Sequence, residues 1–363
     1  MKVKAQLTEE NPMGTDGFEF VEYTAPDPVE LARLFETLGF SRVARHRSKD
    51  VVLYRQGDIN FIINAEPDSF SQQFARDHGP SICAMALRVA DARAAYERAL
   101  SLGARPHHGD IGPMELHIPA IKGIGDSAIY LVDRYGERTI YDVDFVPVEG
   151  RSFSQPPPPP AGLSGRAGLL NIDHLTHNVE RGHMDEWAGF YERLFGFTEQ
   201  RFFDIQGKHT GLRSRAMVSP CGKIRIPINE SADDKSQIEE YLEAYGGEGI
   251  QHLALSTEDV VATVAALRER GVRFLDTPDT YYELLDERLP GHAQDVPRLQ
   301  EHKVLLDGAP PRLLLQIFTE TVIGPIFFEL IERRGDQGFG EGNFQALFEA
   351  MELDQIRRGV LSA

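Results

Sequence analysis

The 363-residue sequence predicts an α+β protein of two tandem domains, each with a curved sheet and helices packed against it. Three observations support this class: the two halves repeat each other, every repeat has a strand, a helix and then further strands, and a proline-rich segment separates the halves. Four such modules of about 50 to 60 residues would build two sheets. The length suits two domains, and 41% hydrophobic residues is ordinary for a globular protein.

The first repeated pair has a strand, an amphipathic helix, a glycine and a strand. It covers FEFVEYTAPDPVELARLFETLGFSRV (18–43) in the first half and LNIDHLTHNVERGHMDEWAGFYERLFGFTEQ (170–200) in the second. The glycines of the Leu-Gly-Phe and Phe-Gly-Phe steps suit left-handed helix caps. We therefore expect the same fold in both segments.

Two further pairs complete the repeat. Residues 81–105 match residues 249–274, again as strand, helix, glycine and strand. Residues 128–146 match residues 313–333, and we expect each to form a hairpin of two apolar strands.

The boundary between the halves is predicted at SFSQPPPPPAGLSGRAG, residues 152–168. Five consecutive prolines join neither helix nor sheet and favour an extended spacer, although a ligand for a proline-recognition domain is an alternative reading. We predict an N-terminal structural domain (1–151), a linker (152–168) and a C-terminal catalytic domain (169–363).

Charge and composition exclude several classes of function. The formal charge of −18 would repel nucleic acid and anionic lipid. The sequence shows no apolar run of the roughly 20 residues that a spanning helix needs and no secretion signal, so we expect a cytoplasmic protein. Cys83 and Cys221 give no disulfide framework and no thiolate metal site.

Glu329 is a carboxylate within the otherwise apolar strand GPIFFELI. Burying a charge is costly unless a partner compensates it, and a divalent metal is a strong partner. His174 in NIDHLTHNV and His252 in GIQHLALST lie in similar apolar runs. Two histidines and one carboxylate form the facial arrangement that leaves open positions on a non-haem ferrous ion. Taken singly, each histidine could be a core residue, and Glu329 could be a charge on an edge strand.

The repeat provides an internal control for these ligands. Aligning VEYT with DHLT places Glu22 opposite His174, and aligning CAMAL with QHLAL places Ala84 opposite His252. The first half therefore lacks the histidine pair, which predicts a metal site in the second half alone. Strand alternation places each ligand on one face with apolar neighbours.

Three other histidines lie near the first ligand in sequence. His177 is on the strand face opposite to His174, and His183 and His209 fall in turn-like segments. We interpret all three as ordinary surface or turn residues.

Candidate substrate-binding residues are amides and phenylalanines. An unpaired amide in an apolar strand costs about 1 to 3 kcal/mol, so Gln251 and Gln316 are expected to serve a specific hydrogen bond. Asn229 and Gln237 either do the same or satisfy loop backbone. Aromatic faces that could stack on a ring, or simply fill the core, come from Phe318, Phe327, Phe339 and Phe344.

The segment after GDQGFGEGN predicts a helix over residues 342–358. Its apolar stripe consists of Phe344, Leu347, Phe348 and Met351. Behind a glycine-rich hinge, such a helix could act as a lid that excludes water, or it could pack permanently on the sheet.

Six strings in order, IDHLTHNV, PINE, GIQHLAL, RLLLQIF, GPIFFELI and GFGEGNF, resemble the bacterial 4-hydroxyphenylpyruvate dioxygenase family of the vicinal oxygen chelate superfamily. NPMGTDGFEF, LYRQGDINFI, GPMEL and PAIKGIGD add to the resemblance in the first half. It implies paired βαβββ modules that form open barrels. It also implies one Fe(II) per subunit on His174, His252 and Glu329, and a pocket made by Ser214, Asn229, Gln237, Gln251 and Gln316. Phe339 and Phe344 would sandwich the substrate ring.

The activity implied by the resemblance is conversion of 4-hydroxyphenylpyruvate and O2 to homogentisate and CO2, a step of tyrosine and phenylalanine catabolism. Gln251, Gln316 and Asn229 would act closest to the chemistry. The alternatives are a hydroxymandelate synthase with the same substrate and an inactive module that binds a small aromatic compound. We expect a homo-oligomer, a dimer or tetramer, because sheets from paired modules often associate.

Overall fold

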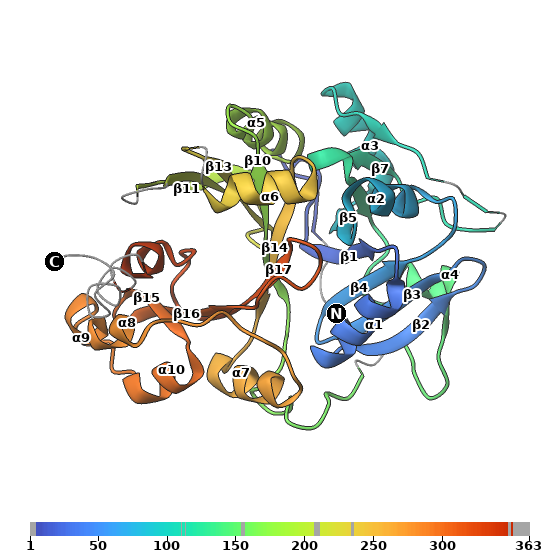
Figure 1. Ribbon diagram of the computed structural model, residues 1–363. Coiled ribbons are helices and arrows are strands. Elements are labelled where there is room, and N and C mark those ends of the chain that lie inside the picture. The colour runs from blue at the N-terminus through green and yellow to red at the C-terminus, as the bar shows by residue number, and fades with distance from the viewer. Residues whose placement is uncertain are drawn as a thin grey trace.

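A computed structural model describes residues 5–109, 111–112, 114–153, 157–206, 211–233, 236–347 and 350. The chain forms two sheets, one from each half, which stand beside each other with helices around them (Figure 1). The predicted α+β class, with one sheet and its helices in each half, is confirmed. In the described part of the chain, no helix is long and apolar enough to cross a membrane.

The first sheet has the strand order β6-β7-β8-β5-β1-β4-β3-β2-β9. Its strands are β1 (Phe18–Thr24), β2 (Ser41–His46), β3 (Val51–Gln56), β4 (Ile59–Asn64), β5 (Ser81–Arg88), β6 (Pro106–His107), β7 (Ala120–Lys122), β8 (Ala128–Val132) and β9 (Phe145–Pro147). The accompanying helices are α1 (Pro28–Thr37), α2 (Phe70–His78), α3 (Ala92–Ser101), the 3₁₀ turn η1 (Ile124–Asp126) and α4 (Tyr141–Asp144).

The second sheet has the order β11-β12-β13-β10-β14-β17-β16-β15. Its strands are β10 (Ile172–Val179), β11 (Thr198–Gln206), β12 (Gly211–Val218), β13 (Arg225–Ser231), β14 (Gly249–Ser256), β15 (Leu305–Ala309), β16 (Arg312–Phe318) and β17 (Phe327–Arg334). Its helices are α5 (Met184–Phe195), α6 (Gln237–Tyr245), α7 (Val260–Glu269), α8 (Asp279–Glu283), α9 (Leu285–Arg288) and α10 (Val296–His302).

The two sheets share one pairing scheme. In the first, β1 is parallel to β4 and antiparallel to β5, which is parallel to β8. In the second, β10, β13, β14 and β17 pair in the same way. Each half thus contains two βαβββ modules, and the central pair of each sheet joins them.

The sequence explains where the repeated helices begin and end. Asp27 caps the start of α1, where its side chain accepts a hydrogen bond from Val29 N, and Pro28 occupies the first turn. Gly196 ends α5 with φ of 72° in the left-handed region, as its position in the sequence predicts.

One predicted hairpin is wrong. Residues 313–333 do contain an antiparallel pair, β16 and β17. Residues 128–146 do not, because β8 pairs with the preceding β7, and β9 pairs with β2 at the far edge of the sheet. The short helix α4 separates β8 from β9 and carries the chain across the sheet, so apolar content alone could not identify the partner strand.

The largest hydrophobic cluster draws residues from both halves. Phe61 of β4 and Phe328 of β17 illustrate the contact, because their rings stack with centroids 6.0 Å apart. The two sheets therefore share buried surface through the faces that turn away from the metal centre described below. Residues 157–168 of the linker run without helix or strand. The domain boundaries proposed from the sequence stay a prediction.

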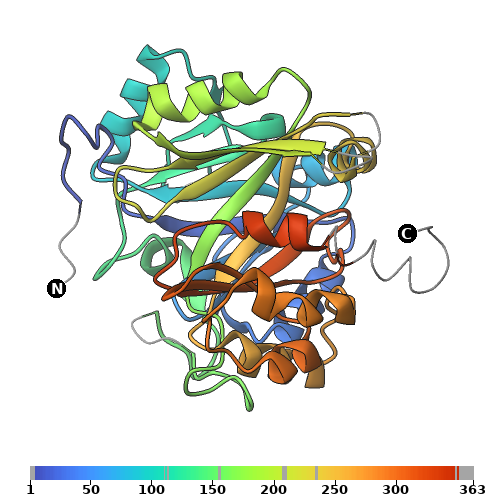
Figure 2. The same ribbon diagram turned by 90° about the vertical axis from the view of Figure 1, so that its left-hand side faces the viewer.

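The predicted C-terminal lid helix is only partly described. Residues 341–347 are helical, and Figure 2 shows this red segment in front of the second sheet. The described residues do not include Phe348, residue 349 or residues 351–358 of the predicted helix.

Candidate metal centre

His174 lies on β10 beside a β-bulge. The ladder passes from the pair Ile172–Leu255 to the pair His174–Ala254, so Asp173 is the extra residue. The bulge brings the Asp173 carboxylate beside the ring that follows it, and the Nδ1 atom of His174 is 2.9 Å from Asp173 Oδ1. This bond places the proton on Nδ1 and leaves Nε2 free to act as a ligand.

His252 lies on β14 beside a second bulge of the same kind. Here the ladder passes from Thr176–His252 to His177–Ile250, so Gln251 is the extra residue. Its Oε1 atom lies 2.9 Å from His252 Nδ1. Each histidine is thus preceded by a bulged residue that orients its ring, a carboxylate in one case and a neutral amide in the other.

Glu329, on β17, completes the cluster. Its Oε2 atom is 3.1 Å from His174 Nε2 and 3.5 Å from His252 Nε2. One potential ligand atom from each of the three residues lies within 4.8 Å of the other two. The three predicted ligands therefore converge from three neighbouring strands, although they are about 80 residues apart in sequence.

The donor set fits a divalent metal. All three side chains are largely or fully buried, and the Oε1 atom of Glu329 is buried without a hydrogen-bond partner among the described residues. An unpaired buried carboxylate oxygen is costly, and a cation would compensate it. Two imidazoles and one carboxylate hold one side of a metal and leave the other coordination positions open.

The charges in the centre support this chemistry. Burial raises the pKa of Glu329, but the charge of His174 and the hydrogen bonds from both histidines outweigh it, so the pKa is lowered. Burial lowers the pKa of His252. For His174 the charge of Glu329 and the bond to Asp173 outweigh burial and raise the pKa. A metal binds an ionised carboxylate and neutral imidazoles. The raised pKa of His174 favours its protonated form without a metal, so binding of a cation would release that proton.

The face of the second sheet that carries this centre has fewer clustered hydrophobic side chains than the corresponding face of the first sheet. In the first sheet a cluster of ten buried hydrophobic residues, among them Phe20, Leu53 and Tyr141, fills the corresponding face. In the second sheet the matching cluster has only Ala254, Leu314 and Ile331. This contrast supports the expectation that the site belongs to the second half.

The ladders correct the alignment of the two halves. Ala84 pairs with Glu22, and His252 pairs with Thr176, so Ala84 corresponds to His252 as expected, but Glu22 corresponds to Thr176. The residue of the first half that is equivalent to His174 is Phe20, because Phe20 pairs with Ala86 as His174 pairs with Ala254. The sequence alignment was two residues out of register. The first half still lacks both histidines.

A row of polar side chains crosses the sheet beside the metal centre. Ser214 of β12 pairs with Asn229 of β13, which pairs with Asn178 of β10. Asn229 Nδ2 lies 3.5 Å from Asn178 Oδ1, and Asn178 Nδ2 is buried without a partner among the described residues. Asn178 and Thr176 were missed from the sequence, although both lie at alternate positions from His174 on the same strand face.

The remaining predicted amides lie in different surroundings. Gln316 on β16 is 1% exposed, and its Oε1 atom has no partner among the described residues. Gln251 holds His252, as described above. Gln237 is the first residue of α6 and is exposed. The buried, unsatisfied Gln316 therefore has the strongest structural reason to bind a substrate group.

Phenylalanine rings surround the two histidines. Phe327 stacks on His252 with centroids 4.8 Å apart, and Phe318 lies 6.0 Å from Phe327. Phe339 meets the edge of His174 at 5.3 Å. Phe344 is 37% exposed at the start of the C-terminal helical segment. The pairing of Phe339 with Phe344 around a substrate ring stays a prediction.

The structure corrects the interpretation of the other histidines. His177 is fully buried, and its Nε2 atom lies 2.7 Å from the hydroxyl of Tyr191 on α5, so it is a core residue. His183 precedes α5 in a turn, as expected, and bonds to Glu248. His209 lies outside the described residues. Strand alternation correctly placed His177 away from the metal but could not show that α5 covers that face.

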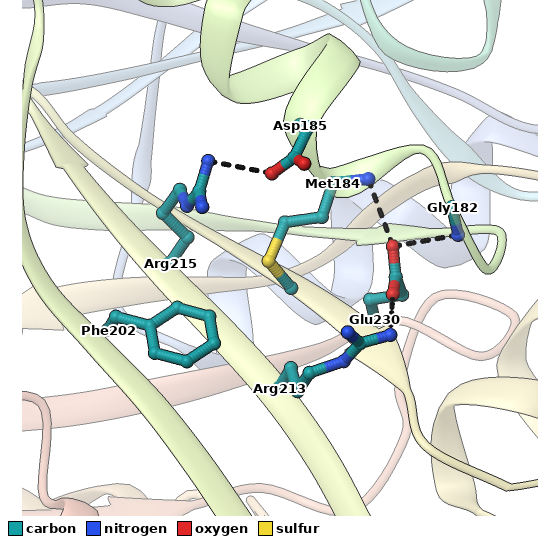
Figure 3. A pocket seen from close by; sticks show the side chains of 7 residues that line it. All are labelled: Gly182, Met184, Asp185, Phe202, Arg213, Arg215 and Glu230. Atoms are coloured by element: carbon teal, nitrogen blue, oxygen red, sulfur yellow. Dashed lines mark hydrogen bonds and ion pairs between the residues drawn. The ribbon is translucent and has the colours of Figure 1, made fainter.

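A separate pocket of about 250 Å³ opens on the opposite face of the second sheet (Figure 3). Arg213 pairs with Glu230, and Arg215 pairs with Asp185 at 2.9 Å, so carboxylates compensate both guanidinium groups. Glu230 also accepts hydrogen bonds from the backbone N–H groups of Gly182 and Met184 before and at the start of α5. This pocket contains no predicted site residue, and its charges serve the local fold.

Comparison with known proteins agrees with this architecture. Residues 9–146 match the family model for the N-terminal part of hydroxyphenylpyruvate dioxygenase, and residues 171–285 match the glyoxalase/bleomycin resistance protein/dioxygenase superfamily. Fold and centre thus define a metal-binding member of that superfamily.

Individual relatives narrow the assignment. The chain is 57% identical to 4-hydroxyphenylpyruvate dioxygenase from Pseudomonas aeruginosa, over 99% of this chain and 100% of the relative. It is 60% identical to hemolysin VllY from Vibrio vulnificus, over 97% and 98%. A mutant 4-hydroxymandelate synthase from Streptomyces coelicolor superposes with a TM-score of 0.78 at 28% identity, over 94% of this chain and 99% of that chain. This chain belongs to the 4-hydroxyphenylpyruvate dioxygenase family.

Proposed function

We propose that this protein converts 4-hydroxyphenylpyruvate and O2 to homogentisate and CO2, with one Fe(II) per subunit held by His174, His252 and Glu329. The observation that carries the proposal is the buried triad with an unpartnered Glu329 oxygen, in a chain 57% identical to a 4-hydroxyphenylpyruvate dioxygenase. When bound, Fe(II) would supply the activation of O2 and an anchoring point for the 2-oxoacid group.

The overall reaction needs no second organic substrate. Loss of CO2 converts the 2-oxoacid end into a shorter carboxylate that takes one oxygen atom, and the ring takes the other as a hydroxyl group while the side chain migrates. Both atoms of O2 and all electrons are accounted for. The protein must therefore bind one organic molecule in one orientation and keep water away from the reacting carbons.

The chain's own residues suit these tasks. Gln251, Gln316 and Asn229 would act closest to the chemistry, with Ser214 and Asn229 in the polar row and Gln316 as an unsatisfied buried amide. Gln237 would approach the substrate from the start of α6. We assign the apolar walls to Phe318, Phe327, Phe339 and Phe344, which would hold the ring and exclude water.

The first half would serve as a scaffold. The corresponding face of its sheet is filled with hydrophobic side chains. Phe20 and Ala84 stand at the positions equivalent to His174 and His252. We retain the cytoplasmic location and the homo-oligomeric state, dimer or tetramer, as proposals from the sequence, and sedimentation of the purified protein tests the second.

Oxygen uptake with product identification tests the function. Purified protein, Fe(II) and 4-hydroxyphenylpyruvate should consume one O2 per substrate and yield homogentisate, identified by mass and NMR. 4-Hydroxymandelate as the product would instead indicate a synthase, to whose solved structure the chain is 28% identical. Tight substrate binding without oxygen uptake would indicate an inactive binding module.

A further inference from the structure

Arg333, near the end of β17, contacts two separate segments beside the metal centre. Its Nε atom donates to Asp173 Oδ2 at 2.7 Å and its Nη2 atom to Asp173 Oδ1 at 2.8 Å. Its Nη1 atom donates to the carbonyl oxygen of Gly338 at 2.7 Å. The guanidinium carbon also lies 5.7 Å from the centre of the Phe339 ring. One side chain thus contacts both Asp173, which holds the His174 ring, and the loop that carries Phe339.

Asp173 depends on this arginine. The carboxylate is 6% exposed, and its Oδ1 atom serves both His174 and Arg333. A buried carboxylate without a partner is strongly unfavourable, and the planar guanidinium meets both of its oxygens at once. Arg225 adds only a longer contact of 3.7 Å to Oδ2. Arg333 therefore fixes the charge and the position of the group that orients the first metal ligand.

We propose, resting on the function above, that Arg333 and Asp173 are positioning residues that set the His174 ring and the Phe339 wall together. His252 has no such device, because the neutral Gln251 orients it. Because a charged carboxylate holds its ring, His174 should be a more basic metal ligand than His252. Through Gly338 the same guanidinium fixes the backbone next to Phe339, whose ring contacts His174. Ligand geometry and the aromatic wall are therefore coupled.

The repeat supplies a matched control. Glu19 is the bulged residue of β1, in the ladder position of Asp173, and it is 2% exposed. It pairs with Arg88 at 2.5 Å, whereas the residue that follows it is Phe20 rather than a metal ligand. The Glu19–Arg88 pair thus has a similar bulge, charge and burial without a metal centre beside it.

The test compares Arg333→Gln, Arg333→Lys and Asp173→Asn with Arg88→Gln. Anaerobic equilibrium dialysis measures Fe(II) binding without turnover, and steady-state kinetics give KM and kcat separately. We expect Arg333→Gln and Asp173→Asn to weaken Fe(II) binding by about 10- to 100-fold and to raise KM for 4-hydroxyphenylpyruvate. Arg333→Lys, which keeps the charge but not the paired bonds, should recover only part of the affinity. Arg88→Gln should lose stability but keep both readouts.

Several outcomes would overturn the proposal. Unchanged Fe(II) affinity in folded Arg333→Gln and Asp173→Asn would do so, as would an equal loss in Arg88→Gln. If Arg333→Gln does not fold, Arg333→Lys and Asp173→Asn decide the question. Failure of the wild-type protein to bind Fe(II) or to consume O2 would instead contradict the proposed function itself, so the two failures are distinguishable.

Discussion

Gly340 packs directly against the side-chain amide of Gln316, so closely that a Cβ atom on Gly340 would overlap it. Gly340 has φ of +77°, a conformation that other residues rarely adopt. The glycine-rich loop that carries Phe339 therefore approaches the sheet at the buried amide that we assign to the substrate.

Gly340→Ala should displace Gln316. Because a shift of about 1 Å at a positioning group can cost about 100-fold in rate, we expect kcat/KM to fall by that order. Gly222→Ala is the matched control, since Gly222 has φ of +70° but no atom within 4 Å of an added Cβ. It tests backbone strain alone, and an equal loss of activity in both variants would contradict the role of Gln316.

Glu329→Gln should lower Fe(II) affinity and kcat/KM by more than about 100-fold, because losing a ligand exceeds the loss of an outer partner. Glu332→Gln is the control on the same strand. Glu332 is 3% exposed and accepts a bond from Val260 N, away from the metal. The measurement is the iron content and the steady-state kinetics of both variants. An iron content of Glu329→Gln close to that of the wild type would contradict the assignment of Glu329 as a ligand.

Gln316→Leu should separate stability from activity. The Oε1 atom of Gln316 is buried without a partner among the described residues, which costs about 1 to 3 kcal/mol. We expect the variant to unfold at the same or higher urea concentration than the wild type, while KM for 4-hydroxyphenylpyruvate rises at least about 10-fold. A clear loss of stability with unchanged KM would show that Gln316 is structural.

His177 should make the protein sensitive to acid. Burial lowers its pKa to about 3, whereas the unfolded chain titrates at about 6.5. Below about pH 6.5 the unfolded state takes up a proton that the folded state excludes, so the free energy of unfolding falls by up to about 1.4 kcal/mol per pH unit. His177→Gln removes this penalty, and its stability deficit against the wild type should shrink as the pH falls from 7 to 4.

His183 gives the opposite sign and serves as the control. Its hydrogen bond to Glu248 raises its pKa, so the stabilisation is present below about pH 6.5 and disappears as the pH rises through the raised value. The deficit of His183→Gln should therefore shrink as the pH rises. Urea unfolding across pH measures both variants, and a pH-independent deficit for His177→Gln would contradict its buried neutral state.

Much of the fold could be predicted because the chain repeats its own pattern. Strand alternation placed His174, His252 and Glu329 on inward faces, and the glycine after α5 marked its end correctly. The hairpin expected at residues 128–146 was wrong, since strand pairing across a sheet depends on long-range contacts that local composition does not encode.

The supporting residues of the centre were harder to predict. Asp173 and Gln251 reach their histidines only because each is a bulged residue, and ordinary alternation would turn both away. Strand pairing aligns Phe20 with His174, a register that the similarity of VEYT and DHLT did not reveal. In the sequence, Arg333 resembles an ordinary surface charge near the end of a strand. Its hydrogen bonds to Asp173 in the structure indicate its role beside the metal centre.

The most direct test of the central claim is anomalous scattering at the iron edge from crystals grown anaerobically with Fe(II). We predict one peak per subunit, within bonding distance of His174 Nε2, His252 Nε2 and a Glu329 carboxylate oxygen. A peak elsewhere, or imidazoles turned away from each other with no metal between them, would contradict the account.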